Sequence, residues 1–271
     1  MSNKMKVYFL DLGEMGTDMN LLVANYTLGL LSDPTPKHIW SSFPVTAVLI
    51  DHPQAGKILY DCGCDPEAEK FWPASVRNMN PFSHTSDQTL EHQLALCGTT
   101  PQEINTVVLS HMHLDHAGSL GLFKHAKIIV NEIEFKDALA YAFEKFNQEG
   151  RALYLRRDLN VDVDEYTLIN GDYELCDGVK LLHLPGHTDG MYGLQLELAD
   201  YGTMILTRDL CYTALNYGPP VRPSGFIKNF AVYSASIEKI RKIEKETNGH
   251  VVFGHDREQF LSMKHAPEYY E

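Results

Sequence analysis

Short apolar runs recur along the whole chain, each four to six residues long and bounded on at least one side by glycine, proline, asparagine or aspartate. Runs of this length next to turn-forming residues are typical of β-strands. The pattern predicts nine strands, at residues 6–10, 45–50, 57–60, 106–110, 127–130, 180–184, 194–198, 203–207 and 250–253.

Three longer segments between the strands have the apolar spacing of amphipathic helices, at residues 87–97, 133–146 and 234–247. In the last of them Ile237, Ile240 and Ile243 share one face, and Gly249 follows the expected end. Two sheets packed face to face with helices outside can bury this many strands and helices together. The sequence therefore predicts an α/β protein, a four-layer αββα sandwich.

No repeat, low-complexity tract or flexible linker divides the sequence, so residues 1–271 are expected to form a single domain. Residues 65–84 fit neither the strand pattern nor the helix pattern. We expect a long loop there, and long ordered loops in compact domains are often lids or binding elements.

Composition and charge narrow the classes of function. Apolar residues make up 44% of the 271 positions and charged residues 22%, as in ordinary folded proteins. The formal net charge of −13 repels phosphate backbones and anionic membranes, so no nucleic-acid or membrane partner is expected. The apolar runs are also far shorter than the ~20 residues that cross a bilayer.

The N-terminal segment 5–10 has the pattern of a strand rather than of an export signal. The five cysteines are odd in number and scattered, which suits reduced thiols better than disulfides. We therefore expect a cytoplasmic protein.

Metal-ligating residue types cluster where the strand at 106–110 ends. The chain continues there as His111-Met-His113-Leu-Asp115-His116. Alternate side chains of an extended chain point the same way, so His111 and His113 are expected to point together. The turn that follows can bring Asp115 and His116 round to a second point, so this segment can serve two adjacent metal ions.

Three later apolar runs also end in a potential ligand, at His187, Asp209 and His255. Strand ends that meet at one edge of a sheet are where α/β proteins commonly place ligands. Imidazole and carboxylate donors suit Zn²⁺, and also Fe, Co or Mn. No thiolate is required, and the one-residue spacing of Cys62 and Cys64 is not that of a zinc motif.

Five histidines and two aspartates are enough for two divalent ions per chain. We assign three residues to the first ion, His111, His113 and His187. Three are assigned to the second ion, namely Asp115, His116 and His255, and Asp209 is expected to bridge, because a carboxylate has two oxygens with free lone pairs. Two such ions lower the pKa of a water held between them, so the expected nucleophile is a bridging hydroxide.

The chain resembles the metallo-β-lactamase superfamily, which has an αββα fold. The resemblance rests on the His-x-His-x-Asp-His motif at 111–116, followed in the order of that superfamily by a Gly-His after a strand, an Asp at a strand end and a late His. More narrowly, the chain is similar to the quorum-quenching N-acyl-homoserine lactonases. That similarity depends on local segments at residues 43–53, 110–118, 209–212, 217–223, 245–248 and 253–256.

The resemblance implies a hydrolase of carboxylic ester bonds that opens the lactone ring of N-acyl homoserine lactones. It implies that Tyr212 hydrogen-bonds the substrate near its carbonyl and that Asp115 passes a proton to the leaving alkoxide. It also implies a homodimer, and an apolar acyl pocket lined by Met15, Leu21, Phe43, Leu114, Tyr212, Phe226 and Ile227.

Other functions remain open at this point, because one metal site on one fold serves many substrates. The main alternative is a hydrolase of the same fold that acts on another small lactone, ester or thioester. A non-catalytic binding module is the alternative from a different class. Structural zinc sites are usually closed by four ligands that often include cysteine, whereas this set mixes His and Asp over two ions and leaves room for water.

Overall fold

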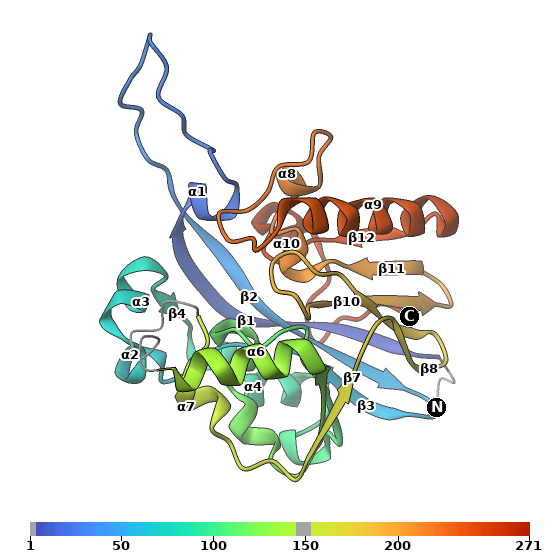
Figure 1. Cartoon of the computed structure of the whole chain (residues 1–271). Coiled ribbons are helices and arrows are strands. Elements are labelled where there is room, and N and C mark those ends of the chain that lie inside the picture. The colour runs from blue at the N-terminus through green and yellow to red at the C-terminus, as the bar shows by residue number, and fades with distance from the viewer. Residues whose placement is uncertain (1–3, 145–152) are drawn as a thin grey trace.

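Two β-sheets lie face to face in the middle of the molecule, and helices cover both outer faces (Figure 1). The structure is a computed structural model that describes residues 4–144 and 153–271. The predicted four-layer αββα sandwich is confirmed. Among the described helices, none is both long and apolar enough to pass through a membrane.

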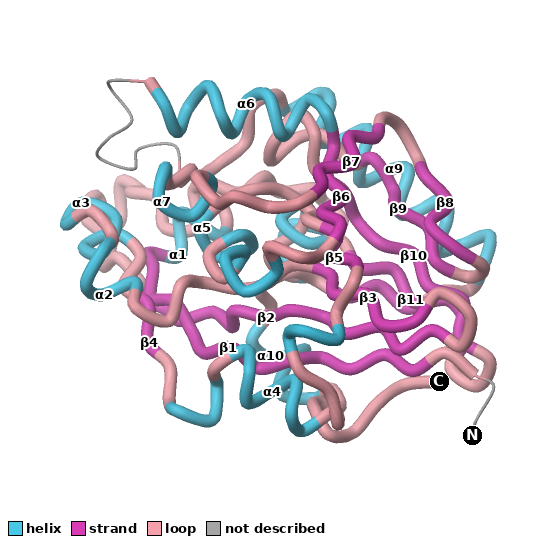
Figure 2. The backbone as a smooth tube through the Cα atoms, turned by 90° about the horizontal axis from the view of Figure 1, so that it is seen from below, coloured by secondary structure: helices cyan, strands magenta, loops and turns pink. Residues whose placement is uncertain are grey.

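The first sheet has seven strands, and its first four are antiparallel neighbours while the rest run parallel to β3. Figure 2 shows β3, β5, β6 and β7 side by side. Their order across the sheet is β4 (Phe82–Ser83), β1 (Lys6–Asp18), β2 (Trp40–His52), β3 (Gly56–Tyr60), β5 (Thr106–Val108), β6 (Lys127–Asn131) and β7 (Glu165–Ile169).

The second sheet has five strands, and only its pair β11 and β12 is parallel. The order across the sheet is β12 (His250–Val252), β11 (Gly202–Leu206), β10 (Tyr192–Leu198), β9 (Val179–His183) and β8 (Tyr173–Cys176). In this sheet β11 and β12, which precede Asp209 and His255, are neighbours, while β10 separates β11 from β9, which precedes His187. The other four predicted ligands follow β5 of the first sheet.

In the described part of the chain, α6 and α9 are the only helices longer than seven residues. The α-helices are α1 (Met19–Leu22), α2 (Ala68–Phe71), α3 (Ala74–Met79), α4 (Leu90–Leu96), α5 (Leu114–Ala117), α6 (Glu132–Phe143), α7 (Arg156–Leu159), α8 (Ala214–Tyr217), α9 (Phe230–Thr247) and α10 (Arg257–Ser262). Single 3₁₀ turns are η1 (Ser86–Gln88), η2 (Pro101–Glu103), η3 (Leu120–Phe123) and η5 (Arg208–Leu210).

Three apolar cores separate the four layers. Successive residues of β1 point to opposite faces, so Tyr8 and Leu10 enter the core under the outer helices while Val7 and Phe9 enter the core between the sheets. On the other side of the second sheet, Ile237 of α9 packs into a third core. Both faces of each sheet are thus buried, and the polar site can only form at the edges where strands end.

The prediction of a long loop at residues 65–84 is wrong. The segment contains α2, α3 and β4, and Ala68, Trp72 and Val76 are buried at four-residue spacing in the core beneath the first sheet. This spacing is helical, but the helical turns are too short, and Pro73 between them too disruptive, for the pattern to stand out. The segment is therefore packed against the core.

Other boundaries also differ from the predictions. The strands predicted at 6–10 and 45–50 extend into β1 and β2, and β4, β7 and β8 were not predicted. The segment predicted as one helix at 87–97 is divided into η1 and α4. The long helix α9 begins before residue 234, because the Asn229 side chain accepts hydrogen bonds from the first backbone amides. Residues 145–146 of the helix predicted at 133–146 lie outside the described residues.

The chain between α1 and β2 forms an arm at residues 24–39 that projects from the body (Figure 1). Leu28, Leu30 and Leu31 on this arm are exposed. The arm begins close to the cavity described below, because α1 precedes it directly.

Candidate metal centre

All seven predicted ligands come together where strands of the two sheets end. His111 and His113 follow β5 in an extended segment, and the single turn α5 then carries Asp115 and His116. The other three residues follow β9, β11 and β12 in turn. All seven side chains are buried.

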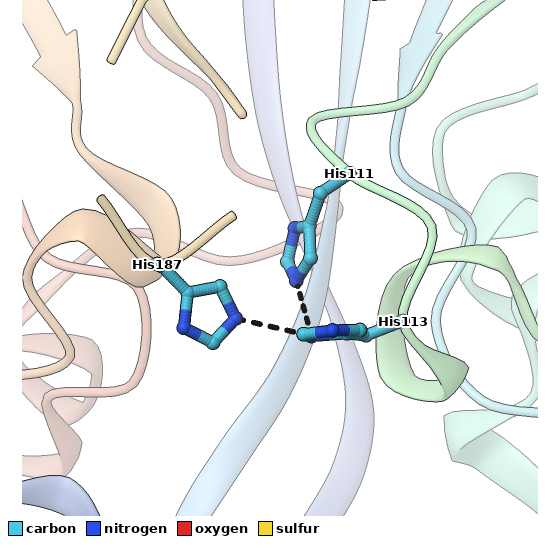
Figure 3. A group of neighbouring side chains, drawn as sticks. All are labelled: His111, His113 and His187. Atoms are coloured by element: carbon cyan, nitrogen blue, oxygen red, sulfur yellow. Dashed lines mark hydrogen bonds between the residues drawn. The ribbon is translucent and has the colours of Figure 1, made fainter. Parts of the chain in front are cut away.

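His111, His113 and His187 form the first group, and Figure 3 shows their rings converging. His113 Nδ1 lies 3.0 Å from His111 Nε2 and 3.0 Å from His187 Nε2. Burial lowers the pKa of all three rings, that of His113 to about 3, so they are neutral imidazoles with free lone pairs. A neutral imidazole carries one N–H, so three converging nitrogens cannot all be satisfied by one another.

Asp115, His116, Asp209 and His255 form the second group. Asp209 Oδ1 lies 3.2 Å from His116 Nε2 and 3.2 Å from His255 Nε2. His116 Nε2 is buried and makes no hydrogen bond to any described residue. Burial favours a lower pKa for His116, but the nearby carboxylates of Asp209 and Asp115 outweigh it and raise the pKa well above its ordinary value. The two carboxylates therefore strongly favour a positive charge next to them, at the place that His116 Nε2 faces.

Asp209 lies between the two groups. Its Oδ1 faces the second group, and its Oδ2 lies 3.4 Å from His187 Nε2 and 3.7 Å from His111 Nε2. Burial alone would raise the pKa of Asp209, but His116 and His255 beside it hold that pKa well below its usual value. Asp209 is thus an ionised carboxylate with one oxygen toward each group.

The donor atoms fit two metal ions. Within each group one donor atom per residue lies within 4.8 Å of all the others. Nitrogens that share a divalent ion at about 2.0–2.1 Å must themselves lie roughly 3 Å apart, and both distances from His113 Nδ1, 3.0 Å each, have this spacing. Cysteine is not part of either group, and burial raises the pKa of the Cys62 and Cys64 thiols well above its ordinary value.

Neighbouring groups fix which ring nitrogen faces the centre. His255 Nδ1 donates to the Pro44 carbonyl at 2.9 Å, and His187 Nδ1 donates to the Phe226 carbonyl at 3.1 Å. His116 Nδ1 lies 2.8 Å from Asp61 Oδ2. Such partners orient a ligating histidine and fix its tautomer. Asp61 was not predicted, although it directly follows the predicted strand 57–60, much as Asp209 lies two residues after 203–207.

An apolar cavity of about 30 Å³ lies over the two groups. Of the residues predicted for the acyl pocket, all but one line this cavity, namely Met15, Leu21, Phe43, Leu114, Tyr212 and Phe226. Ile227 instead lines a second cavity of about 220 Å³, and His113, Leu153 and Phe226 line both. The two cavities therefore adjoin each other at these shared residues.

The cavity wall also contains four residues that were not predicted to line it, namely Thr17, Leu22, Asn80 and Leu153. Two of them are polar. Thr17 Oγ1 and Asn80 Oδ1 are buried and have no hydrogen-bond partner among the described residues. Buried polar atoms normally have a partner, so these two atoms mark positions where a ligand or a water would be bound.

Tyr212 lies at the boundary between the cavity and the two groups. Its hydroxyl is 3.4 Å from His187 Nδ1, and its ring packs near His187 and His255. Burial and the nearby Asp209 raise the pKa of Tyr212 well above its ordinary value, so the hydroxyl keeps its proton. It is therefore a hydrogen-bond donor beside the cavity that Tyr212 lines.

The fold and the site together define a two-sheet α/β protein whose strand ends carry a histidine- and aspartate-rich centre able to hold two metal ions. Comparison with known proteins places the chain among relatives with this architecture. The chain belongs to the metallo-beta-lactamase superfamily, which it matches over residues 41–198.

Several named lactonases are similar to this chain over almost the full length of both proteins. N-acyl homoserine lactonase AiiB of Agrobacterium fabrum is 36% identical over 277 residues, which cover 98% of this chain and 99% of that protein. AiiA of Bacillus thuringiensis subsp. kurstaki, also an N-acyl homoserine lactonase, is 30% identical and covers 97% of this chain and 98% of its own. A solved N-acyl homoserine lactone hydrolase, with the product N-hexanoyl-L-homoserine at its catalytic metal centre, has a TM-score of 0.82 at 28% identity and covers 99% of this chain and 100% of that chain.

Proposed function

We propose that this protein is a metal-dependent hydrolase that opens the lactone ring of N-acyl homoserine lactones. The single observation that carries the proposal is the two-part His/Asp centre under an apolar cavity, in a chain that aligns from end to end with named lactonases of this fold. The centre supports hydrolysis, and the cavity supports a small substrate with an apolar chain.

In this proposal His111, His113 and His187 hold one divalent ion and Asp115, His116 and His255 hold the other, with Asp209 between them. Zinc suits the imidazole-rich set best, and Fe, Co and Mn are the other candidates. When bound, such ions lower the pKa of water and polarise an ester carbonyl.

The protein's own groups supply the rest of the reaction. Water adds to the lactone carbonyl carbon, the ring C–O bond breaks, and an N-acyl homoserine is released. The Tyr212 hydroxyl donates to the carbonyl oxygen as negative charge develops there. Burial works against ionisation of Asp115, but His116 lowers its pKa, so its carboxylate accepts the proton of the attacking water and returns it to the ring oxygen that leaves.

The cavity sets the orientation of the substrate. We place the lactone ring above His113, which lines both cavities, and direct the acyl chain toward Met15, Leu21 and Phe43, where the space of about 30 Å³ has to widen as the chain enters. Thr17 Oγ1 and Asn80 Oδ1 are fully buried, unpaired polar atoms among the described residues of that wall, and the acyl amide is the polar group nearest the ring.

The test is acid release from a panel of lactones, measured with protein of known metal content. The panel contains short- and long-chain N-acyl homoserine lactones, γ-butyrolactone, an aromatic lactone and a thioester. Rapid opening of the acyl homoserine lactones with about two ions per chain supports the proposal. Two ions with hydrolysis of only another ester or thioester would replace the proposed substrate, and Asp209→Asn protein serves as the inactive control.

The cellular location and assembly are also part of the proposal. All five cysteines are free, which supports a reducing compartment such as the cytoplasm. The exposed leucines of the arm at 24–39 support a homodimer, because projecting apolar side chains gain from being covered by a second copy. Sedimentation of wild-type protein and of Leu31→Ser protein checks this, and two identical monomeric profiles would refute it.

A further inference from the structure

A buried arginine lies directly behind the second group of predicted ligands. Arg208 precedes Asp209 in the chain and is only 3% exposed. Its backbone is in the left-handed region, with φ of +47°, and so is that of Asp61, with φ of +61°. Non-glycine residues adopt this conformation at a cost in free energy, and such residues concentrate at functional sites.

The guanidinium of Arg208 is held on several sides. Its Nη1 donates to Thr46 Oγ1 at 2.9 Å, and its Nη2 donates to the Tyr60 carbonyl at 3.2 Å. The group also lies over the Tyr60 ring, 4.6 Å from its centroid. Arg208 Nε is 3.0 Å from Asp61 Oδ2. The charge is thus fixed in place against one carboxylate oxygen.

That same oxygen contacts the predicted ligand His116. Asp61 Oδ2 lies 2.8 Å from His116 Nδ1 and accepts from Ser110 Oγ at 2.8 Å, while Asp61 Oδ1 accepts from the Ser110 amide at 2.7 Å. Asp61 is completely buried. A buried carboxylate without an opposite charge is strongly unfavourable, and Arg208 supplies a permanent positive charge in contact with it.

We propose that Arg208 is a positioning residue for the second metal site and acts through Asp61 on His116. The arginine balances the charge of the buried carboxylate and holds it in one orientation. The carboxylate in turn keeps His116 with its proton on Nδ1 and its Nε2 directed at Asp115 and Asp209. This inference depends on the proposed metal centre, but it does not depend on which substrate the protein hydrolyses.

The test is a double-mutant cycle read out by metal affinity. Wild-type protein and the variants Arg208→Met, Asp61→Asn and the double variant are titrated with Co²⁺ against a chromophoric chelator, and the visible absorption spectrum of bound Co²⁺ is recorded. We expect each single variant to weaken one of the two sites about 10- to 100-fold and to change the spectrum of that site, and to leave the other site unchanged.

The double variant separates action through Asp61 from ordinary packing. If Arg208 acts through Asp61, the double variant binds the weakened ion no worse than Asp61→Asn alone, because the carboxylate that needs balancing is already gone. Additive losses, or wild-type affinity in Arg208→Met, would overturn the inference. If Arg208→Met does not fold, Arg208→Lys decides the matter, since it keeps the charge but cannot reach Thr46, Tyr60 and Asp61 together, and we expect a weaker loss confined to the same site.

A matched control is Arg241→Met on α9. Arg241 bonds to the Tyr217 carbonyl and to Glu238, and neither belongs to the centre. Its removal should leave both Co²⁺ affinities unchanged. Wild-type protein that binds no divalent ion would overturn this inference, whereas protein that binds two ions without opening any lactone would refute only the proposed function.

Discussion

The two halves of the centre are built from different chemistry. The first half, His111, His113 and His187, consists of neutral rings held by burial. The second half contains two carboxylates as well as two histidines, and Asp61 with Arg208 lies behind it. Both halves share the buried Asp209, yet of the two groups only the second has a carboxylate of its own, Asp115.

This difference has a consequence for metal binding. Neutral imidazoles bind a cation through their lone pairs alone, whereas carboxylates also attract its charge, and that attraction is strong where water is excluded. We therefore expect the second half to retain an ion under conditions that empty the first. The three imidazoles of the first half are neutral, so an ion bound there would keep more of its positive charge. That charge would help to polarise a substrate carbonyl.

The largest effect should come from Asp209→Asn, which breaks both halves at once. The amide keeps the shape but loses the charge that faces all four neighbouring rings. Losing several kcal/mol of charge stabilisation corresponds to a fall in kcat/KM of about 1000-fold or more. Rates on an N-acyl homoserine lactone and metal content by mass spectrometry check this, with circular dichroism as the control for folding. Full activity with two bound ions would show that Asp209 does not serve the centre.

The next test compares His187→Ala with His255→Ala. Each variant should keep about one ion per chain and lose about 100-fold or more in kcat/KM. The remaining ion in His187→Ala protein lies in the carboxylate-bearing half, so we expect it to withstand at least about tenfold more chelator than the ion in His255→Ala protein. Equal resistance in the two variants would mean that the halves do not differ in the way their charges suggest.

The ligands of the centre could be predicted from the sequence because they are unusual residue types placed directly after apolar runs. His111 and His113 follow a strand, and alternation alone predicts that they point together. Asp61 and Arg208 could not be paired in this way, because they are far apart in the chain and meet only through the contact of the two sheets. Tertiary partners of this kind leave no local pattern.

The fold shows the same limit. The layers could be predicted because short apolar runs specify strands. The part of β1 beyond residue 10 was not predicted, because the register shift between Asp11 and Glu14 interrupts the alternation of apolar and polar residues. The polar wall residues Thr17 and Asn80 were missed for a related reason. A threonine in a strand is ordinary by sequence, and only the structure shows that its hydroxyl is buried without a partner.

A smaller effect is expected from Tyr212→Phe, which tests the donor that faces the first half. A hydrogen bond to a group carrying charge contributes about 1.5–3 kcal/mol, so kcat/KM should fall about 10- to 100-fold. Both ions should remain, because the hydroxyl contacts Nδ1 of His187, whereas Nε2 of that ring faces the centre. The measurement is steady-state kinetics with metal content, and loss of one ion would instead make Tyr212 part of the metal site.

The smallest effect concerns the cavity that both halves face. In Thr17→Val a methyl group replaces a buried hydroxyl that has no partner in the free protein, so the midpoint of thermal unfolding should rise by roughly 1–4 °C. If that hydroxyl binds the acyl amide, kcat/KM for N-acyl homoserine lactones should fall about 2- to 10-fold, while γ-butyrolactone, which has no amide, should be hydrolysed at the same rate. The matched control is Thr17→Ser, which keeps the hydroxyl and should keep the preference for amide-bearing substrates. Equal losses on both substrates in Thr17→Val would mean that the residue shapes the cavity and does not recognise the amide.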